Sequence, residues 1–241
     1  MSGIRVLVTR PQPGADRTAV RLAYLGYAPV LLPLTQTVAL AQKLPAAKPN
    51  LVVATSPKAF FHLSEELRDM LTGVPVAVTG EGSAAAARNA GLTHVEAAGG
   101  NVAGLVDRLG RSILPATRVL YLAGRVRRPD LELFLQGSAA KFDLIEAYDT
   151  ISVSYSTEKL RQASAGGSFS SALLTSVETV AALAGISNVD FTHAIEFSIF
   201  ICLSERIAEA ARNKFNNPIA VAVEPTEDGL MDCLIKTVPR I

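Results

Sequence analysis

The sequence has few of the residues on which disulfide-bonded and metal-binding proteins depend. It contains two cysteines, Cys202 and Cys233, and both lie in apolar patterns, so we expect free, buried thiols in a reducing, cytoplasmic compartment. Its three histidines, His62, His94 and His193, are scattered without the spacing of metal ligands. We therefore expect no metal site.

Long apolar runs and an excess of charge are absent as well. The longest apolar stretches, such as Ile199–Leu203, are far too short to cross a bilayer, and the sequence opens on a strand rather than on a signal peptide. The net charge of +1 gives no general attraction to nucleic acid or to acidic membranes. We expect neither as a partner, and any anion must be bound by local groups.

Core-forming residues are plentiful. Hydrophobic residues make up 49% of the 241 residues, which is enough for one large domain or for two of about 120 residues each. Short apolar strands alternate with segments of helical spacing along the whole chain, beginning with a strand over 4–9 and a helix over 15–25. This alternation predicts an α/β protein with mostly parallel sheets.

Three local expectations concern the turns between these elements. Ser56 followed by Pro57 predicts a helix with serine at the N-cap, running to about Leu71. The segment 80–83, Gly-Glu-Gly-Ser, predicts a turn before a helix over 84–90. Between the helix over 178–184 and the strand over 198–203 we expect no further element.

Short pieces of the first half recur in the same order in the second half. Chance would hardly place all of them in register, so the pattern predicts a tandem duplication of a five-strand α/β unit. The matched pieces are Val6–Arg10 with Val119–Leu122, Thr55-Ser56 with Thr175-Ser176, Ala87-Arg88-Asn89 with Ala211-Arg212-Asn213, and Gly104–Asp107 with Gly229–Asp232.

Two extended segments, 30–40 and 144–154, each follow one strand–helix unit and lead into another. Each copy of the duplication could close on itself, giving domains 1–112 and 113–241. Alternatively the copies exchange halves, giving a discontinuous domain, 1–34 with 155–241, a second domain, 41–146, and paired connectors, 35–40 and 147–154. The long connectors favour the exchange, although the sequence leaves both arrangements open.

An ordered set of short motifs runs over nearly the whole chain. The motifs are Thr9-Arg10-Pro11, Thr55-Ser56-Pro57, Gly80 with Ser83, Gly124 with Arg128, and Ala147-Tyr148-x-Thr150. Together they resemble the uroporphyrinogen-III synthase family. The resemblance implies two flavodoxin-like, doubly wound parallel-sheet domains joined by a two-stranded β-ladder in the exchanged arrangement.

The resemblance also implies an activity. Members of the family are lyases that cyclise hydroxymethylbilane, a linear tetrapyrrole, with inversion of ring D and loss of water, giving uroporphyrinogen III in heme biosynthesis. No metal or organic cofactor takes part. The substrate would be handed over by porphobilinogen deaminase, and we expect a monomer.

The implied substrate is a polycarboxylate, and ligands of doubly wound sheets bind beyond the carboxyl ends of the strands. Helix N-termini at that edge favour carboxylates. Plain helix capping is the alternative role for the serines there. The expected substrate-binding residues are Arg10, Thr55, Ser56, Gly80, Ser83, Gly124, Arg125, Arg128, Thr175, Ser176, Ser204 and Arg206.

Tyr148 is the expected catalytic residue. It matches the connector tyrosine of the family, whose implied role is to assist loss of the substrate hydroxyl, and a phenol can donate a hydrogen bond to a leaving oxygen. The alternative is an aromatic ring packed where the connectors meet a domain. We assign Tyr121 and Tyr155 to the core or the surface, and Arg127 and Lys58 to a solvated face.

Two other functions stay open. The chain could be a two-lobed, non-catalytic binding protein for an anionic small molecule. It could also be a degenerate relative without activity, because Ser204-Glu205-Arg206 stands where the family often has glycine and threonine. Glu205 would repel substrate carboxylates, although Ser204 keeps a hydroxyl.

Overall fold

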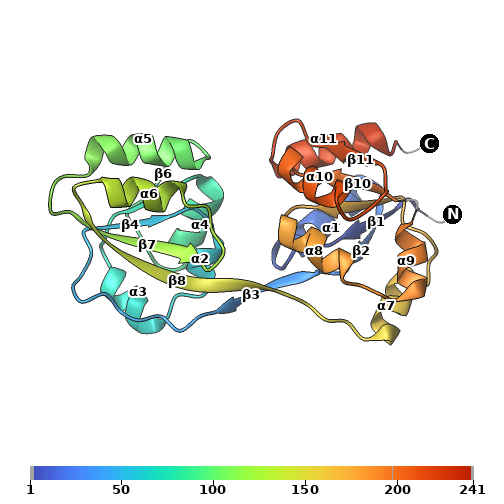
Figure 1. Ribbon diagram of the computed structural model, residues 1–241, viewed down its shortest axis with the longest axis horizontal. Coiled ribbons are helices and arrows are strands. Elements are labelled where there is room, and N and C mark those ends of the chain that lie inside the picture. Colours follow the sequence, from blue (N-terminus) through green and yellow to red (C-terminus); the bar gives the residue numbers. More distant parts are fainter. Residues whose placement is uncertain (1–2, 197, 240–241) are drawn as a thin grey trace. The chain divides into compact units, whose positions relative to one another are not determined.

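The chain forms two compact units in this computed structural model, Met1–Gln36 with Ile151–Ile241, and Thr37–Thr150. The structure describes residues 3–196 and 198–239. Met1 and Ser2, which precede the first predicted strand, lie outside the described residues. Each unit is built on a mostly parallel sheet with helices on both faces (Figure 1). The predicted α/β class with two parallel-sheet domains is confirmed. In the described part of the chain, no helix is long and apolar enough to cross a membrane.

The first unit is built on a sheet whose described strands follow the order β11-β10-β9-β1-β2, all paired in parallel. The strands are β1 (Arg5–Val8), β2 (Ala28–Leu31), β9 (Ser171–Leu174), β10 (Ile199–Cys202) and β11 (Ile219–Val221). Its helices are α1 (Gly14–Tyr24), α7 (Thr157–Ser164), α8 (Val177–Ala184), α9 (Val189–Ile195), α10 (Glu205–Arg212) and α11 (Glu227–Thr237).

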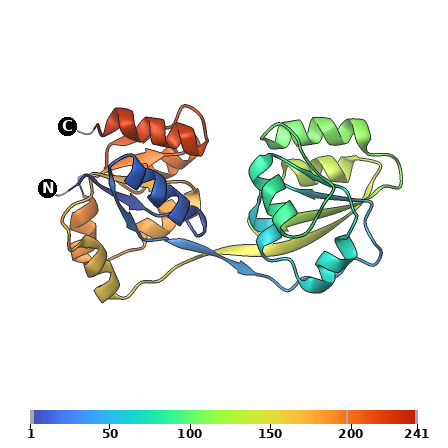
Figure 2. The same ribbon diagram turned by 180° about the vertical axis from the view of Figure 1, so that it is seen from behind.

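Two apolar layers enclose this sheet. Successive strand residues point to opposite faces, so Leu7 packs with α7, α8, α9 and α10, whereas Val6 and Val8 pack with α1 and α11. Figure 2 shows the molecule from behind, with α1 in blue and α11 in red. Both faces of β1, β9 and β10 are therefore buried, which explains their continuous runs of apolar residues.

The second unit has the described strand order β3-β8-β7-β4-β5-β6. The strands are β3 (Thr35–Ala39), β4 (Leu51–Ala54), β5 (Val76–Val78), β6 (Val95–Ala97), β7 (Arg118–Gly124) and β8 (Lys141–Ser152). One face packs on α2 (Lys58–Phe61), α3 (Glu65–Leu71) and α4 (Glu81–Asn89), and the other on α5 (Val102–Ser112) and α6 (Asp130–Gly137).

Both sheets share one strand order. Counted along the chain, the first unit reads β2-β1-β9-β10-β11, which is the flavodoxin-like order 2-1-3-4-5. The second unit gives the same order when counting starts at β7, as β8-β7-β4-β5-β6. Apart from β3 at the edge of the second sheet, each unit thus joins two strands from one half of the chain to three from the other. This favours the predicted duplication with exchanged halves, which stays a prediction, as does the role of the β3–β8 pair as an interdomain ladder.

The prediction of a single helix over 56–71 is wrong. The structure has two helices here, because α2 ends at Phe61 and α3 begins at Glu65. Ser64 starts α3: its hydroxyl accepts a hydrogen bond from the Leu67 amide, and its own amide donates to the side chain of Gln42. Ser56 is not the N-cap residue of α2, although its hydroxyl accepts a hydrogen bond from the second amide after it.

Two further local expectations are also wrong. The segment 80–83 is not a separate turn, since Gly80 is the N-cap residue and Ser83 lies in the first turn of α4. An additional helix, α9, occupies the stretch for which we expected no element. Asn188 begins it by accepting a hydrogen bond from the Phe191 amide, at 3.0 Å.

Candidate active site

Each sheet has one point at its carboxyl edge where the strand order reverses, and ligands of such folds bind there. In the first unit this point lies between β1 and β9, beside Arg10 and Thr175. In the second unit it lies between β4 and β7, beside Thr55 and Gly124. The predicted residues therefore fall at the expected edge of each sheet.

A cavity of about 190 Å³ lies at this point of the second unit. It brings together four predicted site residues: Thr55 after β4, Gly124 at the end of β7, Arg128 in the following turn and Tyr148 on β8. The other lining residues are Val102, Tyr121, Val126, Arg127 and Leu131. Hydroxyl groups, two guanidinium groups and an apolar wall thus converge on one small volume.

Tyr148 is buried, with 8% of its surface exposed, and its ring lies against Gly124. A Cβ atom at position 124 would come 2.7 Å from the Cζ atom and 2.9 Å from the hydroxyl oxygen of Tyr148. The pairing of β7 and β8 shifts register between Ala123 and Gly124, so that Gly124 is aligned with Tyr148. Such bulges redirect side chains next to active sites. Packing alone explains why glycine is required here.

The turn after β7 contains three arginines, Arg125, Arg127 and Arg128, which differ in their ion pairs. Arg125 is exposed and forms ion pairs with Asp149 at 3.0 Å and Glu146 at 3.5 Å. Arg128 is exposed and, among the described residues, forms no recorded ion pair. Of the two residues in this turn expected to bind carboxylates, Arg128 is the one whose charge is available to an anion.

Arg127 does not lie on a solvated face, which corrects the sequence interpretation. Its side chain is 19% exposed, and its guanidinium lies 2.9 Å from both Glu132 on α6 and Glu146 on β8. Burial alone would lower the pKa of Arg127, but hydrogen bonds to these two carboxylates and their charges outweigh burial and raise it. Arg127 also donates a hydrogen bond to the carbonyl oxygen of Gly124, so it links the turn after β7 to α6 and β8.

Tyr121 is a cavity residue that the sequence interpretation missed. It is buried on β7, as expected for a core residue, yet it lines the cavity beside Thr55. Burial raises the pKa of Tyr121, opposed by a hydrogen bond with Thr55 and by the charge of Arg127. The phenol therefore stays protonated at neutral pH and can act as a donor. No sequence motif marks Tyr121, because an apolar strand pattern also fits a plain core residue.

Besides Arg125, three predicted residues of the second unit do not line the cavity. Ser56 accepts a hydrogen bond from the amide of Lys58 at 3.3 Å. Gly80 starts α4, and a Cβ atom on it would come 3.2 Å from the Cα atom of Gly100. Ser83 is buried in the first turn of α4. Each has a local structural role, but neither serine is the N-cap residue of a helix, so the capping expected as their alternative role is wrong for both.

In the first unit, Arg10 is held by neighbouring helices. It pairs with Glu227 of α11 and donates a hydrogen bond to Thr18 of α1 at 3.2 Å. Ser176 caps α8 by accepting a hydrogen bond from the Thr179 amide at 3.2 Å, and Thr175 precedes it, partly buried. These contacts favour anchoring for Arg10 and capping for Ser176.

The turn before α10 contains two side chains that are available to bind a ligand. Ser204 is the N-cap residue, but its side chain makes no capping hydrogen bond. Arg206 is exposed and forms no recorded ion pair with a described residue. Glu205, which departs from the family pattern, pairs with Arg212 at the other end of the same helix, at 2.5 Å. That pairing reduces the repulsion that Glu205 would exert on a carboxylate.

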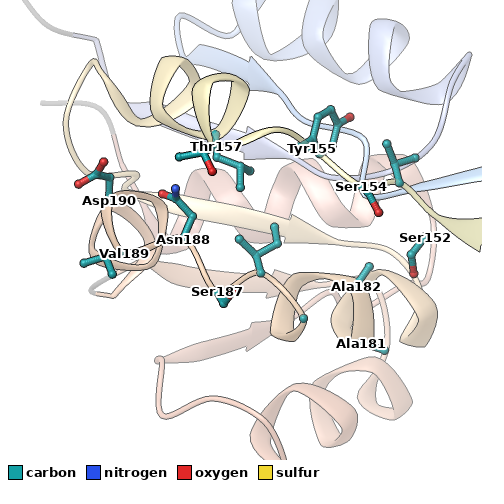
Figure 3. Close-up of a pocket in the computed structure, with 14 residues that line it drawn as sticks. Ser152, Ser154, Tyr155, Thr157, Ala181, Ala182, Ser187, Asn188, Val189 and Asp190 are labelled. Atoms are coloured by element: carbon teal, nitrogen blue, oxygen red, sulfur yellow. The ribbon is translucent and has the colours of Figure 1, made fainter.

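A larger cavity of about 640 Å³ lies elsewhere in the first unit (Figure 3). Tyr155 and Thr157 line it from the segment entering α7, and Asn188 and Asp190 line it from the start of α9. Its lining, within the described chain, includes Asp190 but neither lysine nor arginine. It is therefore a poor site for a polycarboxylate. The described side chains also contain no group of three or more His, Cys, Asp or Glu that could hold a metal ion.

Comparisons with known proteins cover nearly the whole chain. A family model described as uroporphyrinogen-III synthase HemD matches residues 16–232. A porphyrin biosynthesis protein HemD of Ruminiclostridium josui is 26% identical over 97% of this chain, which spans 48%, about half, of that relative's length.

Solved structures agree in fold. Uroporphyrinogen-III synthetase of Helicobacter pylori superposes with a TM-score of 0.65 at 17% identity, covering 97% of this chain and 99% of that one. A mutant uroporphyrinogen III synthase of Thermus thermophilus gives a TM-score of 0.52 at 16% identity, covering 98% of each chain. At these identities the similarity shows the fold alone.

Proposed function

The chain belongs to the uroporphyrinogen-III synthase family, and from that membership we propose that it cyclises hydroxymethylbilane to uroporphyrinogen III in heme biosynthesis. The reaction is that of a lyase, with inversion of ring D and loss of water. The observation that supports it most directly is the cavity in which Thr55, Gly124, Arg128 and Tyr148 meet.

The main task of such an enzyme is orientation. The linear substrate also closes unaided, to the wrong isomer, so the protein has to favour one conformation over another. Arg128, which has no ion-pair partner among the described residues, provides a guanidinium for a substrate carboxylate, and Thr55 provides a hydroxyl in the same cavity. In the first unit, Ser204 and Arg206 are the proposed binding groups, because neither is engaged by a recorded cap or ion pair among the described residues.

Tyr148 is the proposed catalytic residue. Its phenol transfers a proton to the hydroxyl oxygen of the substrate as the carbon–oxygen bond breaks, so that the oxygen leaves as water. The phenolate then takes up the proton that the tetrapyrrole releases when the ring closes. Its ring is fixed by Gly124, so the hydroxyl has a defined position relative to the turn that carries Arg128. A fixed donor costs little reorganisation during the reaction.

The setting of the reaction is part of the same proposal. Porphobilinogen deaminase supplies the linear tetrapyrrole, and the protein acts as a monomer in the cytoplasm. The free thiols of Cys202 and Cys233 support a reducing compartment. Light scattering coupled to size-exclusion chromatography tests the oligomeric state, and a dimer mass at assay concentration would contradict it.

A coupled assay tests the activity. Porphobilinogen deaminase generates hydroxymethylbilane in the presence of this protein, and chromatography separates the oxidised type I and type III isomers. We expect type III with the protein and type I with the deaminase alone. Type I alone in both reactions would reject the proposed activity, and binding of an octacarboxylate porphyrin without turnover would instead favour a non-catalytic binding protein.

A further inference from the structure

We propose that Tyr121 is a substrate-binding residue, whose hydroxyl forms with Thr55 and Arg128 a subsite for one carboxylate side chain of the tetrapyrrole. This inference rests on the proposed function and adds a residue that no motif of the sequence pointed to. It follows from the position of Tyr121, from the size of the cavity and from the charges around it.

Strand pairing places the two hydroxyl groups on the same side of the sheet. Tyr121 of β7 is aligned with Val53 of β4, and Thr55 follows Val53 by two residues. Alternate residues of a strand point to the same face, and Val53 and Tyr121 belong to the same apolar cluster. The side chains of Tyr121 and Thr55 therefore project from the same face of the sheet, and both line the cavity at the carboxyl edge of that sheet.

The cavity has the size of a substituent rather than of the whole ligand. Its volume of about 190 Å³ is below the roughly 300–1,000 Å³ of pockets that enclose a complete small molecule. Val102 and Leu131 provide an apolar wall for methylene groups, and the hydroxyls with Arg128 provide the polar contacts. An acetate or propionate side chain has this combination of a short apolar stem and an anionic end.

The charges around the cavity favour this assignment. Arg127 is already neutralised by Glu132 and Glu146, so it contributes structure rather than net attraction. Arg128 has no recorded ion pair among the described residues and is available to a carboxylate. Because burial raises the pKa of Tyr121, its phenol remains a neutral donor at the pH of the reaction. A neutral donor does not repel the carboxylate, unlike a phenolate.

Tyr121→Phe in the full chain removes the donor and keeps the ring. The dissociation constant of uroporphyrin III, a stable octacarboxylate, is measured by fluorescence quenching, and KM and kcat come from the coupled assay. We expect the dissociation constant and KM to rise about tenfold while kcat stays within about twofold, as for loss of a hydrogen bond to a charged group. The matched control is Tyr27→Phe: this buried tyrosine donates to the carbonyl oxygen of Val238, away from the cavity, and both constants should stay at wild-type values.

Thr55→Val provides a second variant if Tyr121→Phe does not fold, and the same rise in the dissociation constant is expected. An unchanged dissociation constant in the folded variant would overturn the subsite. So would a lower kcat with unchanged KM, because the hydroxyl would then serve the chemical step. If the wild-type protein yields only the type I isomer while Tyr121→Phe still weakens uroporphyrin binding, the proposed function fails and the subsite stands.

Discussion

The ring of Tyr148 fills the space that a side chain would occupy at Gly124. The bulge in the β7–β8 pairing brings the two residues into alignment, and the contact is closer than any Cβ atom could accept. The amide of Arg125, the next residue, donates to the carbonyl oxygen of Tyr148 at 2.9 Å, which fixes the backbone on both sides. The phenol and the turn after β7 thus behave as one unit.

Gly124→Ala tests this contact. The added methyl group must displace the ring of Tyr148 or the turn, so we expect turnover to fall at least tenfold and the free energy of unfolding to fall by about 1–3 kcal/mol, as in other overpacked sites. Steady-state assays and denaturant unfolding measure the two effects. Gly137→Ala is the control, since a Cβ atom there meets nothing within 4 Å and stability should change by no more than about 0.5 kcal/mol. Wild-type turnover in Gly124→Ala would disprove the steric argument.

Tyr148→Phe separates chemistry from packing. The variant keeps the ring that fills the space at Gly124, so we expect an intact fold by circular dichroism. Turnover should fall by about 100-fold, the lower end of the effect of a positioned proton donor. Tyr155→Phe serves as the control, because that hydroxyl donates to the carbonyl oxygen of Pro33 outside this cavity. Unchanged turnover in Tyr148→Phe would return this residue to a packing role.

Arg128→Gln removes a positive charge beside the cavity that forms no ion pair within the described part of the chain. We expect KM to rise about tenfold, since a charge-assisted contact with a carboxylate is lost, and the dependence of KM on salt to become weaker. Arg118→Gln is a matched control. Arg118 is an exposed arginine at the start of β7, whereas Arg128 lies in the turn after the end of that strand. Equal changes in both variants would indicate a general effect of net charge, not a binding contact.

Arg10 and Glu227 should be coupled in stability. Both side chains are about one third exposed or less, at 27% and 33%, so we expect a coupling energy of about 1 kcal/mol in a double-mutant cycle. Arg10→Gln, Glu227→Gln and the double variant are compared by urea unfolding. A raised KM for Arg10→Gln with no loss of stability would instead favour substrate binding by Arg10.

His62 should make stability depend on pH. Burial lowers its pKa in the folded protein, and its Nε2 atom lies 2.8 Å from the hydroxyl oxygen of Thr37. The unfolded chain takes up its proton near the ordinary value of about pH 6.5, so below that pH the unfolded state binds more protons and stability falls. His62→Gln should lose this part of the decline between about pH 7.5 and 5. Parallel unfolding curves for both proteins over that range would contradict the assignment.

Short-range signals predicted most of the fold. Alternating apolar patterns located the strands. Asn101 and Thr226 belong to the residue types that commonly begin helices, and each accepts a hydrogen bond from an amide three residues on. The break between α2 and α3 could not be predicted in the same way. It depends partly on Gln42, which is distant in sequence and accepts the amide hydrogen of Ser64. Where a distant side chain decides a boundary, local propensity is insufficient.

The site was predictable to the same extent. Motifs pointed to Gly124, Arg128 and Tyr148, which the structure brings to one cavity. They assigned Arg127 to a solvated face, because the carboxylates that hold it come from α6 and β8 and no local pattern reveals them. Nor could they distinguish Tyr121 from a core residue, since the strand pattern shows which face is buried but not where that face opens into a cavity.

The strand order has a consequence for synthesis on the ribosome. The first unit needs β9, β10 and β11 to extend β1 and β2, and the second needs β7 beside β4. A growing chain that has reached only α5 therefore holds incomplete portions of both sheets, with apolar strand edges still uncovered. Neither unit can be finished before the later half emerges, so a nascent chain stalled at this point should depend on chaperones far more than one whose domains close in succession.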